Sequence, residues 1–166
     1  MTNLDLSNQF ILNPSGIGFS DLDRMMQKIT KHNVDYADFY FQYSKNEFWS
    51  IEDGAVKNGS FSIDQGVGIR SVSGEKSAFT YSDDININAL DAACKIVNSI
   101  KNQGQSKSVP LKSPKKRKLL YTTSNPLESL DNLSKIKLLE RIERKAKSLD
   151  PRIKKVSASL AAQYEI

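Results

Sequence analysis

Polar and apolar side chains alternate through residues 36–81, a segment that also holds most of the aromatic residues of the chain. An alternation with a period of two is typical of β-strands that bury one face. Asp53-Gly54 is a strong signal for a tight hairpin turn, because both residue types tolerate a positive φ angle. Further turns are predicted at Lys45-Asn46 and Ser73-Gly74. We therefore expect four antiparallel strands in this segment, arranged as a β-meander.

The longest of these strands is predicted from Ala55 to Val72, and its centre carries the candidate site. Side chains alternate across a strand, so we expect one face to present Phe61, Ile63, Val67 and Ile69. The other face carries two glycines, and a strip without side chains lets another backbone approach closely. The candidate residues for binding a substrate or a partner are Asp64, Gln65, Gly66, Gly68 and Arg70. The alternative is that the glycines only admit a helix or a neighbouring strand.

Three segments show the 3.6-residue periodicity of amphipathic helices, and they cover residues 19–33, 84–101 and 134–149. Their N-caps are predicted at Ser20, at Asp83 or Asp84, and at Ser134. In the third helix Lys135 and the other basic residues should lie in water. The side chains expected to face inward from that helix are Ile136, Leu139, Ile142, Ala146 and Leu149.

Residues 1–18 are predicted to be irregular, residues 102–118 a solvated basic linker, and residues 153–165 a final strand. The sequence therefore predicts an α+β fold, a single α/β domain over residues 1–166. In it an antiparallel β-meander sheet is packed by about three helices, and the chain ends in a strand. Because that strand stops at Ile166 without a following turn or partner, we expect a domain cut from a longer protein.

The composition is that of a globular protein, with 39% hydrophobic and 26% charged residues. No apolar run approaches the roughly 18 residues that a membrane helix needs, and the first ten residues lack the features of a signal peptide. The single cysteine, Cys94, rules out an internal disulfide framework and suits a reducing compartment. We expect a cytoplasmic protein without membrane contact.

The net charge of +5 is unevenly distributed along the chain. Residues 1–100 carry 8 basic and 13 acidic side chains, whereas residues 101–166 carry 16 basic and 6 acidic ones. A basic half is typical of proteins that bind an anionic partner such as nucleic acid, and the run Lys115–Lys118 would fit that role. The competing interpretation is the edge of a lysine-rich linker. Since 18 of the 24 basic residues are lysines spread over a linker and a helix face, a nucleic-acid partner is the weaker alternative.

The residues needed for a complete catalytic site are missing from the sequence. A catalytic zinc ion normally takes three protein ligands, yet the chain has one histidine, His32, and one cysteine, Cys94. A serine triad would have to use the same histidine, without a nucleophile-elbow motif. Gly66-x-Gly68 lacks the third glycine and the following helix of a dinucleotide-binding loop. We therefore predict no catalytic residue, no metal ligand and no cofactor site in this chain.

Several segments of the meander and of the residues after it resemble the N-terminal region of the TldD branch of the PmbA/TldD peptidases. The most specific is the block Ile63–Arg70, read as Ile-Asp-Gln-Gly-Val-Gly-Ile-Arg. The resemblance extends in order over essentially the whole chain. It includes Ala37–Gln42, Ile51–Gly54, Val72–Lys76, Phe79-x-Tyr81, Leu120-Tyr121, Asn125–Leu127 and Val156–Leu160.

This resemblance implies the N-terminal domain of a cytosolic zinc metallopeptidase that cleaves unfolded peptides together with a PmbA/TldE-type partner subunit. In that family the zinc ligands come from an H-E-x-x-x-H helix and a later cysteine of the C-terminal domain. No such motif occurs here, and His32 and Cys94 match neither ligand position. The expected role is therefore assembly and substrate guiding, with zinc and catalysis supplied by the family's catalytic C-terminal domain. The alternative is a basic nucleic-acid-binding or scaffold module without a role in peptidase activity.

Overall fold

A computed structural model describes residues 3–31, 34–100 and 124–166. These residues form two compact units. Unit 1 lies within residues 1–43 and 64–123 together with Ile166, and unit 2 within residues 44–63 and 124–165. Two long strands, β1 (Tyr36–Glu52) and β2 (Ala55–Ser73), contribute residues to both units. The predicted basic linker, with Lys115–Lys118, and His32 lie outside the described residues.

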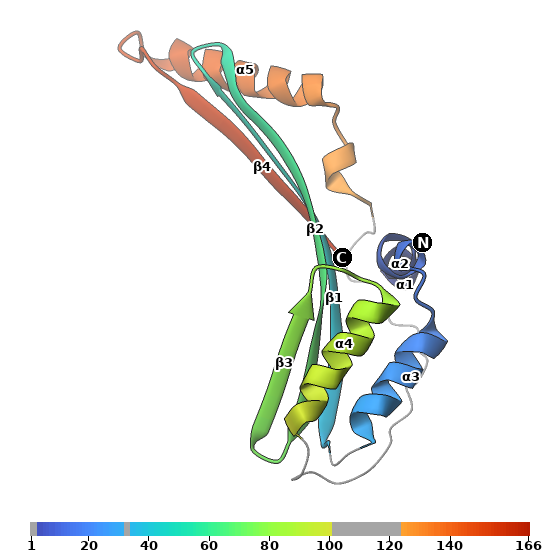
Figure 1. The fold of residues 1–166 in the computed structure, drawn as a ribbon. Helices are drawn as coiled ribbons and strands as arrows, with labels where there is room; N and C mark the ends of the chain where they lie inside the picture. The colour runs from blue at the N-terminus through green and yellow to red at the C-terminus, as the bar shows by residue number, and fades with distance from the viewer. Residues whose placement is uncertain (1–2, 32–33, 101–123) are drawn as a thin grey trace. The chain divides into compact units, whose positions relative to one another are not determined.

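The strands form one antiparallel sheet in the order β3-β2-β1-β4, where β3 is Lys76–Ser82 and β4 is Ser157–Glu165. In unit 1, Val67–Ser73 of β2 pair with β3, and in unit 2, Ser44–Glu52 of β1 pair with β4 (Figure 1). This arrangement confirms the predicted α+β fold and the strand at the end of the chain. Among the described helices, none is both long enough and apolar enough to cross a membrane.

The turn predicted at Lys45-Asn46 is wrong, because β1 continues through both residues as one strand. The polar residues of this stretch had suggested a turn. Instead, their backbone pairs with β4, and the side chain of Lys45 forms an ion pair with Glu128 at 3.6 Å. The hairpin turn at Asp53-Gly54 is confirmed by φ angles of 49° and 76°, the left-handed conformation that a type I′ turn needs at both positions.

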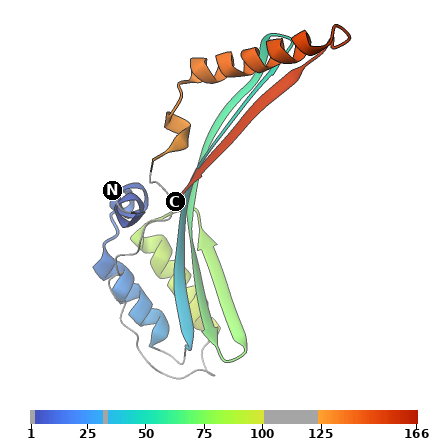
Figure 2. The same cartoon turned by 180° about the vertical axis from the view of Figure 1, so that it is seen from behind.

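Helices α3 (Phe19–Thr30) and α4 (Ile87–Val97) pack in unit 1 on one face of the sheet, as Figures 1 and 2 show from opposite sides. A short 3₁₀ turn, η2 (Asn98–Ile100), follows α4. The hydrophobic core between these helices and the sheet includes Met25, Ile29, Val67, Ile69, Leu90, Cys94 and Val97. The core therefore lies between a two-helix layer and a sheet layer, as expected from the helical periodicity.

The helix caps of unit 1 differ from the predicted ones. Helix α3 begins after Gly18, whose N–H donates to the carboxylate of Asp21 at 3.1 Å, so the predicted cap at Ser20 is wrong. Helix α4 is capped by Asn86, whose side-chain oxygen accepts from two backbone N–H groups, and not by Asp83 or Asp84. Short polar side chains are good caps at several neighbouring positions, so the sequence did not distinguish among them.

The N-terminal segment is helical rather than irregular, which corrects the prediction for residues 1–18. It consists of α1 (Asn3–Ser7), the π-helical turn η1 (Asn8–Leu12) and the short α2 (Asn13–Ser15). Pro14 lies near the start of α2, where a proline is tolerated, and Gly16 ends it with a φ of 66°. Pro14 and Gly16 therefore lie at the boundaries of one helical turn.

In unit 2, the 3₁₀ turn η3 (Pro126–Glu128) and helix α5 (Asn132–Leu149) precede β4. Helix α5 is capped by Asp131, which accepts from the N–H of Ser134 at 2.6 Å, so Ser134 is not the cap. Its buried row consists of Lys135, Leu139 and Glu143. Of the residues predicted to face inward, Ile142 and Leu149 are exposed. The apolar pattern was misleading because two of the three buried positions carry charges.

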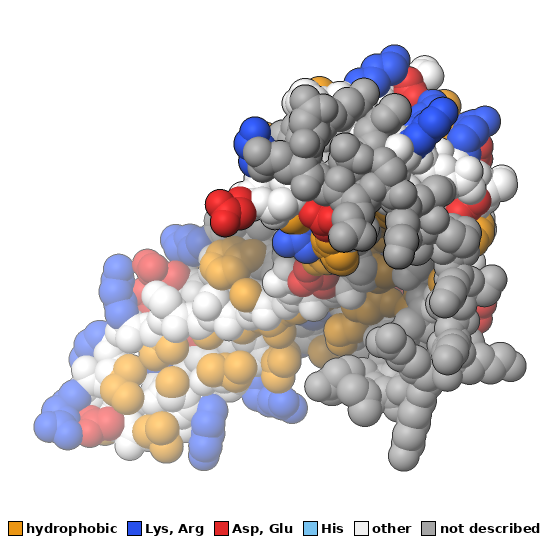
Figure 3. Space-filling view, turned by 90° about the horizontal axis from the view of Figure 1, so that it is seen from below, with side chains coloured by type: hydrophobic (Ala, Val, Ile, Leu, Met, Phe, Trp, Pro, Cys, Tyr) orange, Lys and Arg blue, Asp and Glu red, His pale blue; other side chains and the backbone are white. Residues whose placement is uncertain are grey.

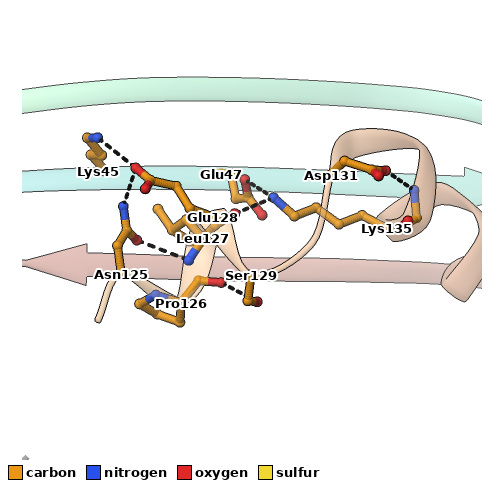
Figure 4. A network of polar contacts seen from close by, with 10 residues as sticks. Lys45, Glu47, Asn125, Pro126, Leu127, Glu128, Ser129, Asp131 and Lys135 are labelled. Carbon is orange, nitrogen blue, oxygen red and sulfur yellow. Dashed lines mark hydrogen bonds and ion pairs between the residues drawn. The ribbon is translucent and has the colours of Figure 1, made fainter. Parts of the chain in front are cut away.

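The buried charge of Lys135 is compensated within unit 2. Its ammonium donates to Glu47 at 2.8 Å and to the carbonyl oxygen of Leu127 at 2.7 Å (Figure 4). Only 6% and 7% of the two side chains are exposed, so the pair joins α5 and η3 to β1 away from water. At the other end of α5, Glu143 accepts from the N–H of Gly54, and Lys147 donates to Asp53. Three polar contacts thus hold the helix to β1 and to the hairpin turn.

Replacing Lys135 by methionine should lower the free energy of unfolding by about 3–5 kcal/mol, because the carboxylate of Glu47 stays buried without its partner. Replacing both residues, as in Glu47→Leu with Lys135→Met, should recover most of this loss. The measurement is denaturant-induced unfolding of the three proteins. The control is Lys155→Met, which removes an ion pair of 3.4 Å from a lysine that is 77% exposed, and it should change little. Equal effects of the two single substitutions would contradict the buried pair.

Helices α3 and α4 of unit 1 are joined by a charged cluster around Asp91. Its carboxylate accepts from Lys28 at 2.6 Å and forms an ion pair with Lys95 at 2.9 Å. These hydrogen bonds, that from Lys28 first, lower the pKa of Asp91 from 3.8 to about 2. The ionised form is therefore the one that the folded state prefers. The ionised carboxylate of Asp91 contributes fully to the stability of the folded state at any pH above 3.8, the ordinary pKa of the group. This contribution is lost as the pH falls through about 2, the pKa in the folded state.

Asp91→Asn should therefore lower Tm at pH 6. The difference in Tm between this variant and the original protein should shrink as the pH falls from 4 to 2. Thermal unfolding followed by circular dichroism across this range would measure both values. Glu75→Gln, in the exposed turn between β2 and β3, removes the same charge and should show no such convergence. A Tm difference for Asp91→Asn that stays constant from pH 6 to pH 2 would contradict the role of the cluster.

Candidate functional site

The candidate residues Gly66, Gly68 and Arg70 lie at alternate positions of β2 in unit 1. Val67 and Ile69, between them, are buried against the helices. The two glycines and Arg70 therefore share the opposite face of the strand, as predicted. We call this surface the glycine face. It consists of Gly66, Gly68 and Arg70 of β2, Tyr36, Asp38 and Tyr40 of β1, and Phe79 and Tyr81 of β3.

The strand pairing explains why residues distant in sequence meet on the glycine face. Gly68 lies opposite Tyr81, and Arg70 lies opposite Phe79, so the side chains of each pair project to the same side. The side chain of Arg70 also reaches β1, where it donates to both carboxylate oxygens of Asp38 at 3.2 and 2.9 Å. Three strands of unit 1 thus contribute to one surface.

The guanidinium of Arg70 is held in a fixed position by its two neighbours on β1. Besides the two hydrogen bonds to Asp38, it lies 5.3 Å from the ring centroid of Tyr36, whose hydroxyl donates to Asp38 at 3.1 Å. The hydrogen bonds to Asp38 raise the pKa of Arg70 above its ordinary value. The guanidinium is planar and has five N–H donors, of which two are used by Asp38.

The glycines of this face are explained by close packing between β2 and β3. A Cβ atom on Gly68 would lie only 3.1 Å from the ring of Phe79, and one on Gly66 only 3.0 Å from the carbonyl oxygen of Ser82. Gly68 therefore makes room for an aromatic ring, and Gly66 for a neighbouring backbone. This geometry agrees with the alternative interpretation of the glycines, in which they admit a neighbouring strand.

Four aromatic side chains remain exposed on the glycine face. Tyr36 is 50% exposed, Tyr40 60%, Phe79 63% and Tyr81 74%. Aromatic rings contribute large contact areas at low entropic cost, and they are enriched where proteins bind other chains. Elsewhere on the molecule, the space-filling view shows hydrophobic side chains at the surface between lysine and arginine side chains (Figure 3). The glycine face therefore has the composition of a binding surface rather than of a reaction centre.

The other two candidate residues, Asp64 and Gln65, are exposed on β2, and Gln65 points away from the glycines by the alternation of the strand. Unlike Val67 and Ile69, which were expected on the same face of the strand, Phe61 and Ile63 are not buried. They are 60% and 49% exposed, because they belong to unit 2, where the stretch of β2 from Ala55 to Ile63 is exposed throughout.

The described residues do not fit a zinc site. Among them, no group of three or more histidine, cysteine or acidic side chains lies close enough together to hold a metal ion. Cys94 lies in the core of unit 1, and burial raises the pKa of its thiol to about 11, which disfavours the thiolate that zinc requires. It is a core residue, as its position on the apolar stripe of α4 had indicated.

Sequence reasoning missed the aromatic part of the glycine face and the buried pair of Lys135 and Glu47. A signal for the former was present. The residues Tyr36, Asp38 and Tyr40 alternate with the inward-facing residues of β1, and antiparallel pairing brings them next to β2. The buried pair joins residues 88 positions apart and had no local signal.

Residues 37–100 match the family model described as PmbA/TldA metallopeptidase domain 1. The chain is 43% identical, over 93% of its length, to a protein of Haemophilus influenzae named Metalloprotease TldD homolog. It is 34% identical over 98% of its length to a protein of the same name from Buchnera aphidicola subsp. Schizaphis graminum. The chain spans about a third of the length of these relatives, 33% and 34% respectively.

Solved structures share the fold at low sequence identity. One is described as a putative modulator of DNA gyrase from Bacteroides thetaiotaomicron, with a TM-score of 0.61 and 14% identity over 88% of this chain and 34% of that one. Another is TldE from Thermococcus kodakarensis, with a TM-score of 0.61 and 15% identity over 88% of this chain and 33% of that one. At such identities the likeness concerns the fold alone.

Proposed function

Because this chain belongs to the PmbA/TldD family and its residues 37–100 match the family's first domain, we propose that it is the N-terminal domain of a TldD-like zinc metallopeptidase subunit. In this role it contributes to assembly with a PmbA/TldE-type partner and guides unfolded peptides toward the catalytic domain. The enzyme cleaves these peptides, and it works in the cytoplasm. The names of the relatives, which are TldD homologs, and of one structural neighbour, TldE, support this proposal.

The observation that carries the binding role is the glycine face. It combines four exposed aromatic rings with a guanidinium fixed by two hydrogen bonds, on a rigid sheet covered by helices on its other side. Unfolded peptides expose apolar side chains and backbone carbonyl groups. The aromatic rings offer contact area for the former, and the remaining N–H groups of Arg70 offer donors for the latter.

Zinc and the cleavage step are assigned to polypeptide outside this chain. The described residues do not fit the metal, as the buried Cys94 and the lack of any clustered set of ligands among them indicate. The relatives are about three times as long as the chain, which leaves room for a further domain in those proteins. The alternative of a nucleic-acid-binding or scaffold module depends on the run Lys115–Lys118, which lies outside the described residues.

Gly68→Val should weaken binding of a purified PmbA/TldE-type subunit or of an unfolded peptide by at least about tenfold, which corresponds to about 1.4 kcal/mol. The reason is steric, since a side chain at this position displaces the ring of Phe79 from the glycine face. Isothermal titration calorimetry with the 166-residue chain would measure the affinity, and circular dichroism would confirm the fold. Tyr81→Ala removes a ring that is 74% exposed and tests the same surface without strain in the sheet.

Lys57→Val is the matched control, because it places the same side chain on an exposed position of β2 in unit 2. It should leave the affinity unchanged. If Gly68→Val and Tyr81→Ala both bind as tightly as the original chain while folded, the glycine face is not the binding surface, and Gly66 and Gly68 serve strand packing only.

A further inference from the structure

Unit 2 contains a pocket that is separate from the glycine face. It has a volume of about 480 Å³, within the range typical of small-molecule sites. Its walls come from β1, β2, η3 and α5, and they include Lys45, Glu47, Trp49, Phe61, Leu127 and Lys135. The buried pair of Lys135 and Glu47 thus belongs to the lining of the pocket. Figure 4 draws this pair together with some of the other lining residues.

Two buried polar atoms of this pocket's lining residues have no hydrogen-bond partner among the residues that the structure describes. One is Oε1 of Glu47, whose other oxygen accepts from Lys135, and the second is Nε1 of Trp49. The two residues lie two positions apart on β1, so their side chains project from the same face of the strand. A buried polar group without a partner is costly, and such groups in folded proteins call for an explanation. A bound molecule that supplies the missing partners would remove this cost.

The charges around the pocket are balanced. Lys135 is paired with Glu47, and Lys45 with Glu128, so two cations face two anions. An ionic ligand would therefore meet a group of like charge as well as one of opposite charge. Among the described residues, the acceptor Oε1 of Glu47 and the donor Nε1–H of Trp49 have no hydrogen-bond partner. These two groups are complementary to a neutral molecule with one N–H donor and one carbonyl acceptor.

We propose that this pocket binds a neutral amide group, with the amide N–H donating to Oε1 of Glu47 and the amide carbonyl accepting from Nε1 of Trp49. The amide belongs either to a peptide backbone or to a primary carboxamide such as the side chain of asparagine or glutamine. The inference does not depend on the proposed function, since it rests on residues of unit 2 alone.

The surroundings of the two atoms favour an amide with an apolar substituent. The ring of Phe61, which is 60% exposed, and the side chains of Leu127 and Leu130 line the same pocket. Both atoms are out of contact with solvent, and both residues line the pocket. The proposal therefore requires that the indole of Trp49 and the carboxylate of Glu47 turn toward the pocket when the ligand binds. The apolar walls exclude water from the resulting hydrogen bonds, which strengthens them.

The test uses the 166-residue chain and its single tryptophan. The indole N–H of Trp49 gives one isolated NMR signal, which should move downfield when the group gains an acceptor. N-acetylleucine methylamide supplies a backbone amide, and isovaleramide supplies a primary carboxamide with the same isobutyl group. At least one of the two should shift the signal in a saturable way, at millimolar concentration, and comparing the two distinguishes the sources of the amide. Methyl isobutyl ketone, without a donor, and isovalerate, with a charge, should bind at least about tenfold more weakly.

Two substitutions, Phe61→Ala and Glu47→Gln, test the site, and a third serves as a control. Phe61→Ala removes part of the wall without touching the buried pair and should weaken amide binding several-fold. Phe79→Ala is the matched control, because that ring is 63% exposed but lies on the glycine face of unit 1, and it should leave binding unchanged. Glu47→Gln should abolish the preference of the pocket for the amide over the ketone. If that variant does not fold, Phe61→Ala decides.

Three results would overturn the proposal. They are an indole signal that neither amide moves, equal responses to the amide and the ketone, and unchanged binding in Phe61→Ala. In the first case the two polar atoms are left to solvent or to another part of the protein, and the pocket has no amide ligand.

Discussion

The pairing of β1 with β2 is the constraint on which both units depend. The two strands are joined by Asp53-Gly54, where both residues adopt a positive φ, and no longer connection intervenes. From this turn the strands run through unit 2 and then through unit 1. Each unit adds one further strand and its own helices to the pair, α3 and α4 in unit 1 and α5 in unit 2. Without the pair, neither set of helices would have a sheet to cover.

The two units use charge in different ways on this common framework. In unit 1, Arg70 and Asp38 pair on an exposed face among aromatic rings, where an ion pair adds little stability; under the proposed function, Arg70 is a donor for recognition. In unit 2, Lys135 and Glu47 pair in the interior, where each charge depends on the other. The first arrangement suits a surface that meets another chain. In the second, one carboxylate oxygen of Glu47, a residue that lines a pocket, has no hydrogen-bond partner among the described residues.

Local patterns predicted most of the longer helices and strands, but neither the N-terminal helical turns nor the contacts between distant elements. The period of two and the Asp53-Gly54 signal predicted the meander, and the apolar stripe around Leu90 and Cys94 predicted the buried face of α4. The prediction of which side of α5 faces inward was wrong. Lys135 and Glu143 can be buried because they have hydrogen-bond partners in β1 and in the hairpin turn. A single sequence does not indicate such pairings. Likewise, the sequence indicated that Gly66 and Gly68 allow a close approach, but it did not indicate of what. The ring of Phe79 lies next to Gly68 because of the register between β2 and β3, which the sequence does not show.

Amide hydrogen exchange, followed residue by residue by NMR on the 166-residue chain, tests most directly whether β1 is one unbroken strand shared by the two units. In unit 2, β1 lies between β2 and β4, so its amides have partners on both sides. The account predicts slow exchange that continues through Lys45 and Asn46, whereas Glu75 in the turn before β3 exchanges fast. Fast exchange at Lys45 and Asn46, like that at Glu75, would show a break in the strand and would contradict the account.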